Sequence, residues 1–214
     1  MCAVRAYYGS RTEVVRYGPD VPAEDDLRLL GDVKGLRVLE LGSGSRSSAV
    51  AFAKQGAYVI AVDPHPERLA ETRFLAEDEE VKVELRDGDL ADLAFLRGDS
   101  MDLAFAAGTV LEVPDLGRLF RQVHRVLKHR ADFAFSYEHP AALVARGRAY
   151  FDEAPITDEV DGVSVDQHPH PLSEVYMALV RTGFVVEAIA EPRPVMGDQA
   201  NPTTIIWRAS KEGA

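Results

Sequence analysis

The sequence has a single cysteine among its 214 residues, and that cysteine is Cys2. An internal disulfide is therefore excluded, as is a metal site built from several cysteines, and a reducing compartment is expected. The chain has no apolar run near the roughly 20 residues that a membrane-spanning helix needs, and its first residues lack the apolar core of a signal peptide. These absences predict a cytoplasmic protein that does not bind membranes.

Basic residues are also scarce. Lysine and arginine number 24 against 35 aspartates and glutamates, which gives a net charge of −11. A surface of this charge repels phosphate backbones and argues against DNA or RNA as the partner. The length and the hydrophobic content of 46% suit one domain with a full core, so we expect residues 1–214 to form a single domain.

From Leu36 onward, short β-branched and apolar runs alternate with segments of helical period. This alternation is typical of an α/β protein with a parallel sheet covered on both faces. Asp115 is expected to cap a helix with Lys128 near its end, and Ser173 is expected to precede another. The predicted strands are residues 36–41, 57–63, 81–86, 102–106, 133–138, 184–190 and 203–209.

Two regions depart from this rhythm, and both could cover a ligand site. Residues 1–35 contain a predicted helix near Ala23–Leu30, and residues 139–172 are too long for an ordinary connector. Open α/β sheets bind ligands at the carboxyl ends of their strands. Segments that cross this edge are expected to form substrate walls.

The stretch LELGSGSRSS, residues 39–48, contains a glycine turn between the first predicted strand and its helix. Gly42 and Gly44 allow a sharp bend, and the amides of residues 45–48 would point out of a helix N-terminus toward a carboxylate or another anion. The dinucleotide fingerprint G-x-G-x-x-G needs a third glycine at Ser47. The turn therefore fits an NAD site poorly.

Three acids follow or precede predicted strand ends, and each allows two interpretations. Asp63 either accepts both hydroxyls of a ribose or caps the next helix, and the two roles are compatible. Glu40, inside an apolar strand, either has a cationic or amide partner or is reached by water. Asp89, in an Asp-Gly-Asp turn, either accepts from an adenine amine or is simply a solvated turn residue.

Four blocks in order carry a family resemblance, namely VLELGSGS, AVDPHPERL, DGDLADLAF and DLAFAAGTVLEVPDLGRLFRQVHRVLK. From about Leu36 to Ser136 they resemble the class I S-adenosylmethionine-dependent methyltransferases, of the small-molecule type related to ubiquinone-pathway enzymes. The resemblance implies a Rossmann-like, doubly wound α/β fold with a mostly parallel seven-stranded sheet whose last strand is antiparallel. It also implies one methyltransferase domain, with residues 1–35 as an N-terminal cap and 139–172 as an inserted substrate-side segment.

The resemblance further implies S-adenosyl-L-methionine as the cofactor and a set of residues around it. The glycine turn would lie along the methionine part, Asp63 would hold the ribose and Asp89 the adenine amine. Arg46 stands where the family has a third glycine, and it either pairs with the cofactor carboxylate or narrows the pocket. The cofactor-binding residues implied are Tyr17, Glu40, Gly42, Ser43, Gly44, Arg46, Asp63, Pro64, Asp89, Leu90 and Ala106.

The implied reaction is in-line methyl transfer to a small-molecule acceptor, which depends mainly on positioning and water exclusion. A general base would assist a hydroxyl acceptor, and the candidates are Glu112 and His139, with His168 and His170 behind them. A metal at these last two histidines is disfavoured because Pro169 between them splays their side chains. Two alternatives stay open: cofactor binding without turnover, and a nicotinamide oxidoreductase, which Ser47 and the Asp89 block disfavour.

Overall fold

The computed structural model describes residues 12–44, 47–160, 162–197 and 199–212. Every strand predicted from the sequence is present, with its ends shifted by a few residues. The strands are β1 (Arg37–Leu41), β2 (Tyr58–Asp63), β3 (Val83–Asp87), β4 (Met101–Ala107), β5 (Leu127–Glu138), β6 (Ile156–Val160), β7 (Val163–Gln167), β8 (Phe184–Ala190) and β9 (Thr204–Lys211). The helices are α2 (Glu24–Leu27), α3 (Ala49–Lys54), α4 (Pro66–Asp78), the 3₁₀ helix η2 (Val110–Glu112), α5 (Leu116–Val126), α6 (Pro140–Ala145) and α7 (Leu172–Arg181).

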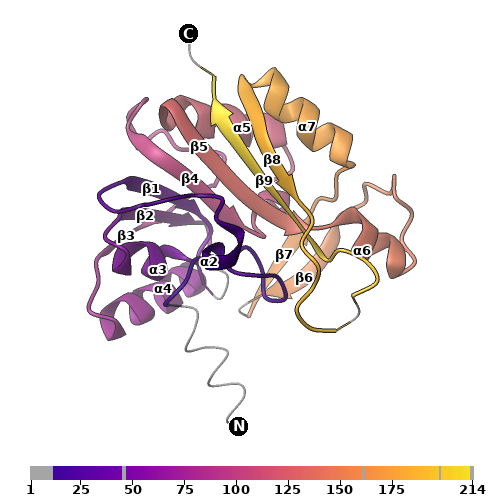
Figure 1. Cartoon of the computed structure of the whole chain (residues 1–214), viewed down its shortest axis with the longest axis horizontal. Coiled ribbons are helices and arrows are strands. Elements are labelled where there is room, and N and C mark those ends of the chain that lie inside the picture. The colour runs from indigo at the N-terminus through magenta and orange to yellow at the C-terminus, as the bar shows by residue number, and fades with distance from the viewer. Residues whose placement is uncertain (1–11, 45–46, 161, 198, 213–214) are drawn as a thin grey trace.

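The main sheet has seven strands in the order β3-β2-β1-β4-β5-β9-β8 (Figure 1). The pairs from β3 to β5 are parallel, whereas β9 is antiparallel to both of its neighbours, β5 and β8. The chain order reverses beside β1, because β2 and β3 lie on one side of it and β4 on the other. This confirms the expected Rossmann-like, doubly wound sheet, and it places a switch point for ligand binding at the carboxyl end of β1.

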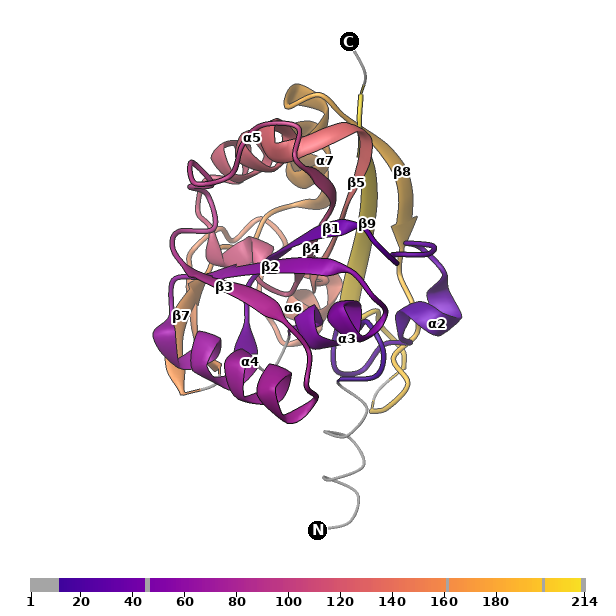
Figure 2. The ribbon, with the colours of Figure 1, turned by 90° about the vertical axis from the view of Figure 1, so that its left-hand side faces the viewer.

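Helices cover both faces of the sheet, with α3 and α4 on one side and α5 and α7 on the other (Figure 2). Side chains alternate between the two resulting cores, as the period of a strand requires. Leu39 and Leu41 of β1 pack in the core under α5, together with Phe120. Val38 lies in the opposite core with Phe52 of α3. Burial on both faces explains why the central strands are nearly continuous apolar runs.

Three predicted helix boundaries need correction. Helix α2 is only one turn long because Arg28 adopts a left-handed conformation, with φ 54°. Asp115 caps α5 as expected, accepting from the Arg118 amide at 2.8 Å, but the helix ends at Val126 and Lys128 lies in β5. Helix α7 begins at Leu172, so Ser173 lies inside it rather than before it.

The segment 139–172 contains α6 and a hairpin of β6 and β7 that forms a separate two-stranded sheet. The hairpin was not predicted because its strands, ITDEV and VSVDQ, are mostly polar and exposed. The amide of His168 donates to the Leu111 carbonyl at 2.7 Å, which ties the end of the hairpin to η2. The inserted segment therefore lies at the carboxyl edge of the main sheet. Among the described residues, no helix has the length and apolar character needed to cross a membrane.

Candidate functional site

The turn after β1 requires glycine at its first position. Gly42 has φ +111°, and a Cβ there would lie 2.4 Å from Cγ2 of Thr109. Thr109 is held in place because its hydroxyl donates to the Leu41 carbonyl at 2.5 Å. The turn after β1 is thus pressed against the connection that follows β4, at the switch point of the sheet.

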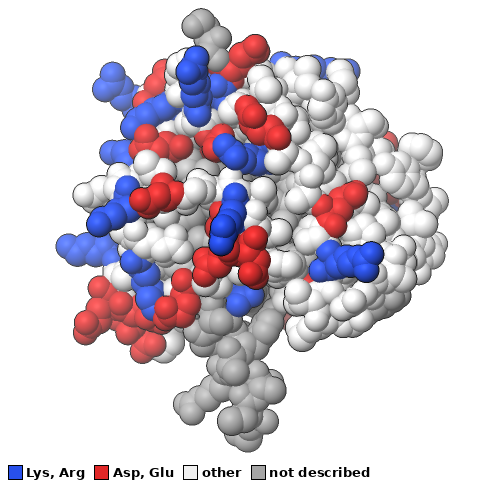
Figure 3. Space-filling model, in the orientation of Figure 1, with Lys and Arg blue, Asp and Glu red and all other residues white. Residues whose placement is uncertain are grey.

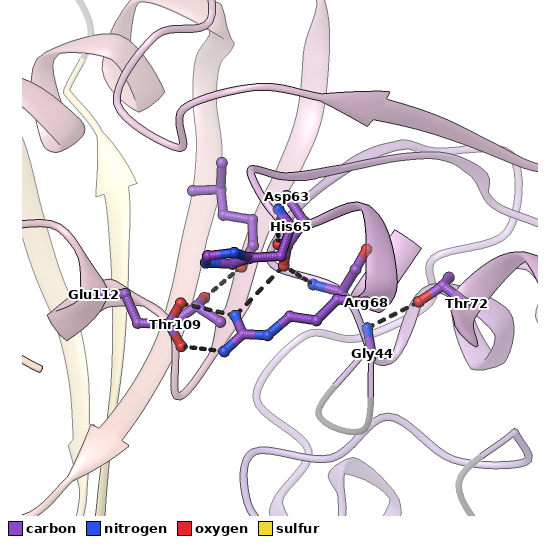
Figure 4. Close-up of polar contacts among 9 residues, drawn as sticks. Gly44, Asp63, His65, Arg68, Thr72, Thr109 and Glu112 are labelled. Atoms are coloured by element: carbon purple, nitrogen blue, oxygen red, sulfur yellow. Dashed lines mark hydrogen bonds and ion pairs between the residues drawn. The ribbon is translucent and has the colours of Figure 1, made fainter. Parts of the chain in front are cut away.

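Two neighbouring elements hold the rest of this turn through its backbone (Figure 4). The Ser43 amide donates to Oδ2 of Asp63 at 2.8 Å, and the Gly44 amide donates to Oγ1 of Thr72 at 3.0 Å. The Ser43 side chain is buried, and its hydroxyl has no hydrogen-bond partner among the described residues. A buried hydroxyl of this kind beside a glycine turn is a polar atom that a bound ligand can pair with.

Glu40 is buried and hydrogen-bonded, so water does not reach it. Its carboxylate accepts from the Ser47 hydroxyl at 2.7 Å and from the Ser48 amide at 2.5 Å, where α3 begins. Burial raises the pKa of Glu40 from 4.5 to about 7, against the lowering effect of the bonds from Ser48 and Ser47; the nearby Asp63 charge adds to the rise. Glu40 therefore fastens the far side of the glycine turn to β1.

Asp63, the last residue of β2, has no exposed surface. Its Oδ1 accepts from the His65 amide and its Oδ2 from the Ser43 amide, each at 2.8 Å. A carboxylate offers about four acceptor sites, so about two remain for a ligand. The prediction that Asp63 caps the next helix is wrong, because the N-cap of α4 is His65 and has no side-chain cap; Asp63 instead holds the preceding turn through the His65 amide, which leaves room for the ribose role. Because the side chain is covered, a ligand reaches these sites only if a neighbouring group shifts.

Arg68 of α4 is a residue that sequence reasoning missed. Its guanidinium forms a bidentate pair with Glu112 of η2 at 2.8 and 3.2 Å, and both side chains are buried, at 1% and 6% exposure. Nη1 of Arg68 also lies 3.6 Å from Oδ2 of Asp63. The available signal was Glu112 itself, an acid within the apolar run Val110–Val113 that needs a cationic partner when buried.

The predicted residues around the adenine are divided between surface and core. The Asp89 side chain is half exposed, with one oxygen accepting from the Ala91 amide at 2.8 Å and the other 3.4 Å from Arg118. Pro64 is exposed, whereas Leu90 and Ala106 are buried. Asp89 and Leu90 follow β3, Pro64 follows β2, and Ala106 lies one residue before the end of β4. Arg46 lies outside the described residues.

A cavity of about 670 Å³ opens beside Ser47, which follows the glycine turn; of the predicted cofactor residues that the structure describes, Tyr17 alone lines it. Its walls come from the carboxyl ends of β4 and β5, the start of β9, and the segment around Tyr17. Tyr17 is tightly held there, since its hydroxyl donates to Glu24 at 2.7 Å and its ring packs 5.4 Å from that of Phe105. The residues that line it include Tyr17, Ser47, Tyr137, Leu143, Ile156 and Thr203.

A second hollow, of about 830 Å³, lies at the opposite edge of the sheet, where Arg37 and Tyr58 begin β1 and β2. Parallel sheets of this type bind ligands at the carboxyl ends of their strands. The cavity beside the glycine turn is therefore the candidate site.

Both candidate bases are engaged by other groups, and neither lines the cavity. Both carboxylate oxygens of Glu112 accept from Arg68. Nδ1 of His139 accepts from the Ala141 amide at 2.9 Å, which caps α6, and Nε2 lies 2.8 Å from Glu191. His139 is also absent from the residues that line the cavity. These positions favour a structural role for both side chains.

The histidines of the inserted segment lie apart from this chemistry. His168 contacts η2 through its backbone, and Nδ1 of His170 lies 2.8 Å from Glu174. In the part of the chain that the structure describes, three or more histidine, cysteine or acidic side chains are nowhere grouped as metal ligands would be.

The fold and the site indicate a methyltransferase that uses S-adenosylmethionine, and comparison with known proteins agrees with this class. Residues 39–135 match the family described as "Methyltransferase domain". A solved structure described as an S-adenosylmethionine dependent methyltransferase from Mesorhizobium loti is 29% identical, with a TM-score of 0.73 over 87% of this chain and 96% of that one. One from Listeria monocytogenes, described as a putative methyltransferase of this type, is 20% identical, with a TM-score of 0.74 over 89% and 96%.

Curated relatives match over shorter stretches. A ubiquinone biosynthesis O-methyltransferase from Azorhizobium caulinodans is 33% identical over 97 residues, which is 45% of this chain and 38% of that protein. A magnesium-protoporphyrin O-methyltransferase from Rhodobacter capsulatus is 33% identical over 114 residues, 52% of this chain and 50% of the relative. The chain thus spans half or less of the length of these two relatives. Over residues 39–135 it is similar to the S-adenosylmethionine-dependent methyltransferases.

Proposed function

We propose that this protein binds S-adenosyl-L-methionine and transfers its methyl group to an oxygen of a small-molecule acceptor. The observation that carries the proposal is the junction at the carboxyl end of β1. There a glycine turn, whose buried Ser43 hydroxyl has no partner among the described residues, adjoins a carboxylate with spare acceptor sites. A cavity large enough for a ligand opens at Ser47, just after this turn. The O-methyltransferase names of the curated relatives support the choice of an oxygen acceptor.

In this proposal the glycine turn and the strand ends hold the cofactor. Residues 42–44 lie along its amino-acid part, and Glu40 supports them from the strand beneath. Asp63 accepts from the ribose, with Pro64 beside the adenine. Asp89 and the Leu90 amide lie at the adenine edge, and the Ala106 carbonyl faces the amino group. Tyr17 forms part of the wall, and Arg46 is proposed to contact the carboxylate.

When bound, S-adenosylmethionine supplies a methyl group on a sulfonium that is already a good leaving group. The task of the chain is therefore to orient the acceptor and exclude water, and it needs no strong base. Tyr137 and Leu143 contribute to the cavity wall next to the glycine turn and are placed to orient an acceptor. Since Glu112 is ion-paired with Arg68 and neither Glu112 nor His139 lines the cavity, we propose that neither removes the acceptor proton.

We also propose that the chain acts as one methyltransferase domain, with residues 1–35 as a cap and 139–172 on the acceptor side. The cavity supports this arrangement, because both segments contribute to its lining. A small acceptor agrees with its volume of about 670 Å³, which the acceptor shares with the amino-acid part of the cofactor.

Titration calorimetry tests the cofactor assignment directly. We expect S-adenosylmethionine and its demethylated product, S-adenosylhomocysteine, to bind, and NAD not to bind. Binding of NAD without any response to the sulfonium compound would overturn the assignment. Release of S-adenosylhomocysteine in the presence of a panel of phenolic and other hydroxylated metabolites then separates turnover from binding alone.

A further inference from the structure

The Arg68–Glu112 pair lies where the proposed function needs a well-ordered carboxylate. Resting on that function, we propose that Arg68, held by Glu112, is a positioning residue that fixes Asp63 for the ribose hydroxyls of the cofactor. The ion pair joins α4 to η2, and Arg68 also lies close to Asp63, the last residue of β2 (Figure 4).

Arg68 contacts its two acidic neighbours, Glu112 and Asp63, in different ways. Two hydrogen bonds, at 2.8 and 3.2 Å, fix the plane of the guanidinium on Glu112. Its Nη1 then lies 3.6 Å from Oδ2 of Asp63, too far for a strong hydrogen bond but close enough for charge attraction. The pair therefore attracts the Asp63 carboxylate without using one of its acceptor sites.

The spare acceptor sites of Asp63 match a vicinal diol. One site on each oxygen is occupied by an amide, from His65 and from Ser43. About one site on each oxygen is left, and a ribose presents two hydroxyl donors. The positive charge of Arg68 near Oδ2 attracts the carboxylate and holds its oxygens in place for the two hydroxyls.

The surroundings of Asp63 make this positive charge useful. Glu40, on the adjacent strand, is buried and interacts electrostatically with Asp63. With Glu112, this places three acids close to one glycine turn. Arg68 supplies positive charge between two of them.

The first test replaces the ion pair by apolar side chains of similar size in the variant R68M/E112L. Exchanges of buried ion pairs for well-packed apolar groups are often neutral for stability, so the variant should fold. The readout is the ratio of the dissociation constants of 2′-deoxy-S-adenosylhomocysteine and S-adenosylhomocysteine, measured by calorimetry. For the unsubstituted protein we expect the deoxy analogue to bind roughly 10- to 100-fold more weakly, as for a hydrogen bond to a charged group.

In R68M/E112L this ratio should fall at least ~3-fold, because a poorly ordered Asp63 gains less from the hydroxyl. An unchanged ratio would overturn the inference, since a purely structural pair would affect both ligands equally. A second variant, R68K, keeps a positive charge near Asp63 but loses the bidentate hydrogen bonding to Glu112. It should have a lower melting temperature and should keep the ratio of the two dissociation constants. Loss of the ratio in R68K with unchanged melting would also contradict the inference. Absence of S-adenosylhomocysteine binding by the unsubstituted protein would instead overturn the proposed function.

Discussion

The two halves of the carboxyl edge of the sheet are built differently. At the ends of β1 and β2, buried acids pair with amides, hydroxyls and a guanidinium, and Asp63 has no exposed surface. At the ends of β4 and β5, the edge opens into a cavity of about 670 Å³ that is walled by segments from outside the regular fold. The first half is fixed by short-range polar contacts, whereas the second depends on how inserted segments fold back.

Charge on the outer surface shows a related asymmetry. In the orientation of Figure 1, acidic and basic side chains are interspersed on one side of the molecule, whereas the side over α7 is mostly uncharged (Figure 3). Exposed apolar side chains of α7 include Tyr176, Met177 and Val180, and those of β8 include Val185 and Ile189. Charged side chains are therefore unevenly distributed over this face of the molecule.

The comparison predicts that the half at the ends of β1 and β2, which we call the closed half, controls cofactor binding. Asp63→Ala should weaken S-adenosylhomocysteine binding roughly 100-fold or more, since two hydrogen bonds to a charged acceptor are lost. It should also lower the free energy of unfolding by about 2–4 kcal/mol, because the Ser43 and His65 amides lose their acceptor. Calorimetry and urea unfolding measure the two effects.

Asp63→Asn is the matched control, since it keeps one acceptor oxygen and the shape of the side chain. It should recover part of the stability but little of the affinity. Full affinity in either variant would mean that the ribose binds elsewhere and that the two halves are not divided as described.

The closed half should also be intolerant of added volume. Gly42→Ala combines a positive φ with a Cβ 2.4 Å from Thr109, and it should cost about 2–4 kcal/mol of unfolding free energy. Gly147→Ala has φ +90° but no atom within 4 Å of the new Cβ, so it should cost about 1 kcal/mol. Equal losses in thermal or urea unfolding would show that the contact with Thr109 relaxes freely.

The raised pKa of Glu40 predicts a pH dependence of the closed half. Folding raises this pKa from 4.5 to about 7, so the folded state binds the proton more tightly than the unfolded state does. The contribution of Glu40 to stability is therefore greatest below pH 4.5, falls as the pH rises to about 7, and is constant above that.

Glu40→Gln removes this titration. Relative to the unsubstituted protein, the variant should gain roughly 2–3 kcal/mol of unfolding free energy between pH 4.5 and 7.5. Urea unfolding at several pH values measures the difference, and Glu84→Gln, at an exposed position of β3, is the control that should show no such trend. A difference that does not vary with pH would show that Glu40 does not titrate in this range.

The smallest effect is expected in the open half, which is the half at the ends of β4 and β5. Ile156→Trp adds a large side chain at the cavity wall, and it should raise the KM for the acceptor a few-fold to tenfold while leaving S-adenosylhomocysteine binding within about twofold. Val163→Trp, on the same hairpin but outside the lining, should leave both unchanged. A loss of cofactor affinity in Ile156→Trp would break the division between the halves.

The same division explains what could be read from the sequence. The seven strands of the main sheet and the glycine turn follow from local patterns, because central strands are apolar runs and a turn needs glycine. The hairpin of β6 and β7 was missed because its short polar strands carry no such pattern. Arg68 was missed because an arginine near the start of a helix looks like an ordinary surface residue. Its burial depends on Glu112, which is 44 positions away in the chain.

Side-chain partners limited the prediction of the candidate bases in the same way. Glu112 and His139 have residue types suited to proton transfer, and both lie beside the carboxyl edge of the sheet. Only the fold shows that Glu112 pairs with Arg68 and His139 with Glu191, away from the lining of the cavity. Residue type indicates what chemistry is available, whereas partners and position decide whether the side chain can use it.

The position of β9 has a consequence for biosynthesis. This strand is the last in chain order, yet it is inserted between β5 and β8. A nascent chain that has emerged only as far as residue 200 carries two strand edges with their backbone groups unpaired, and it must keep them apart from other chains until the next dozen residues appear. Translation pauses near this point should increase self-association before the sheet can close.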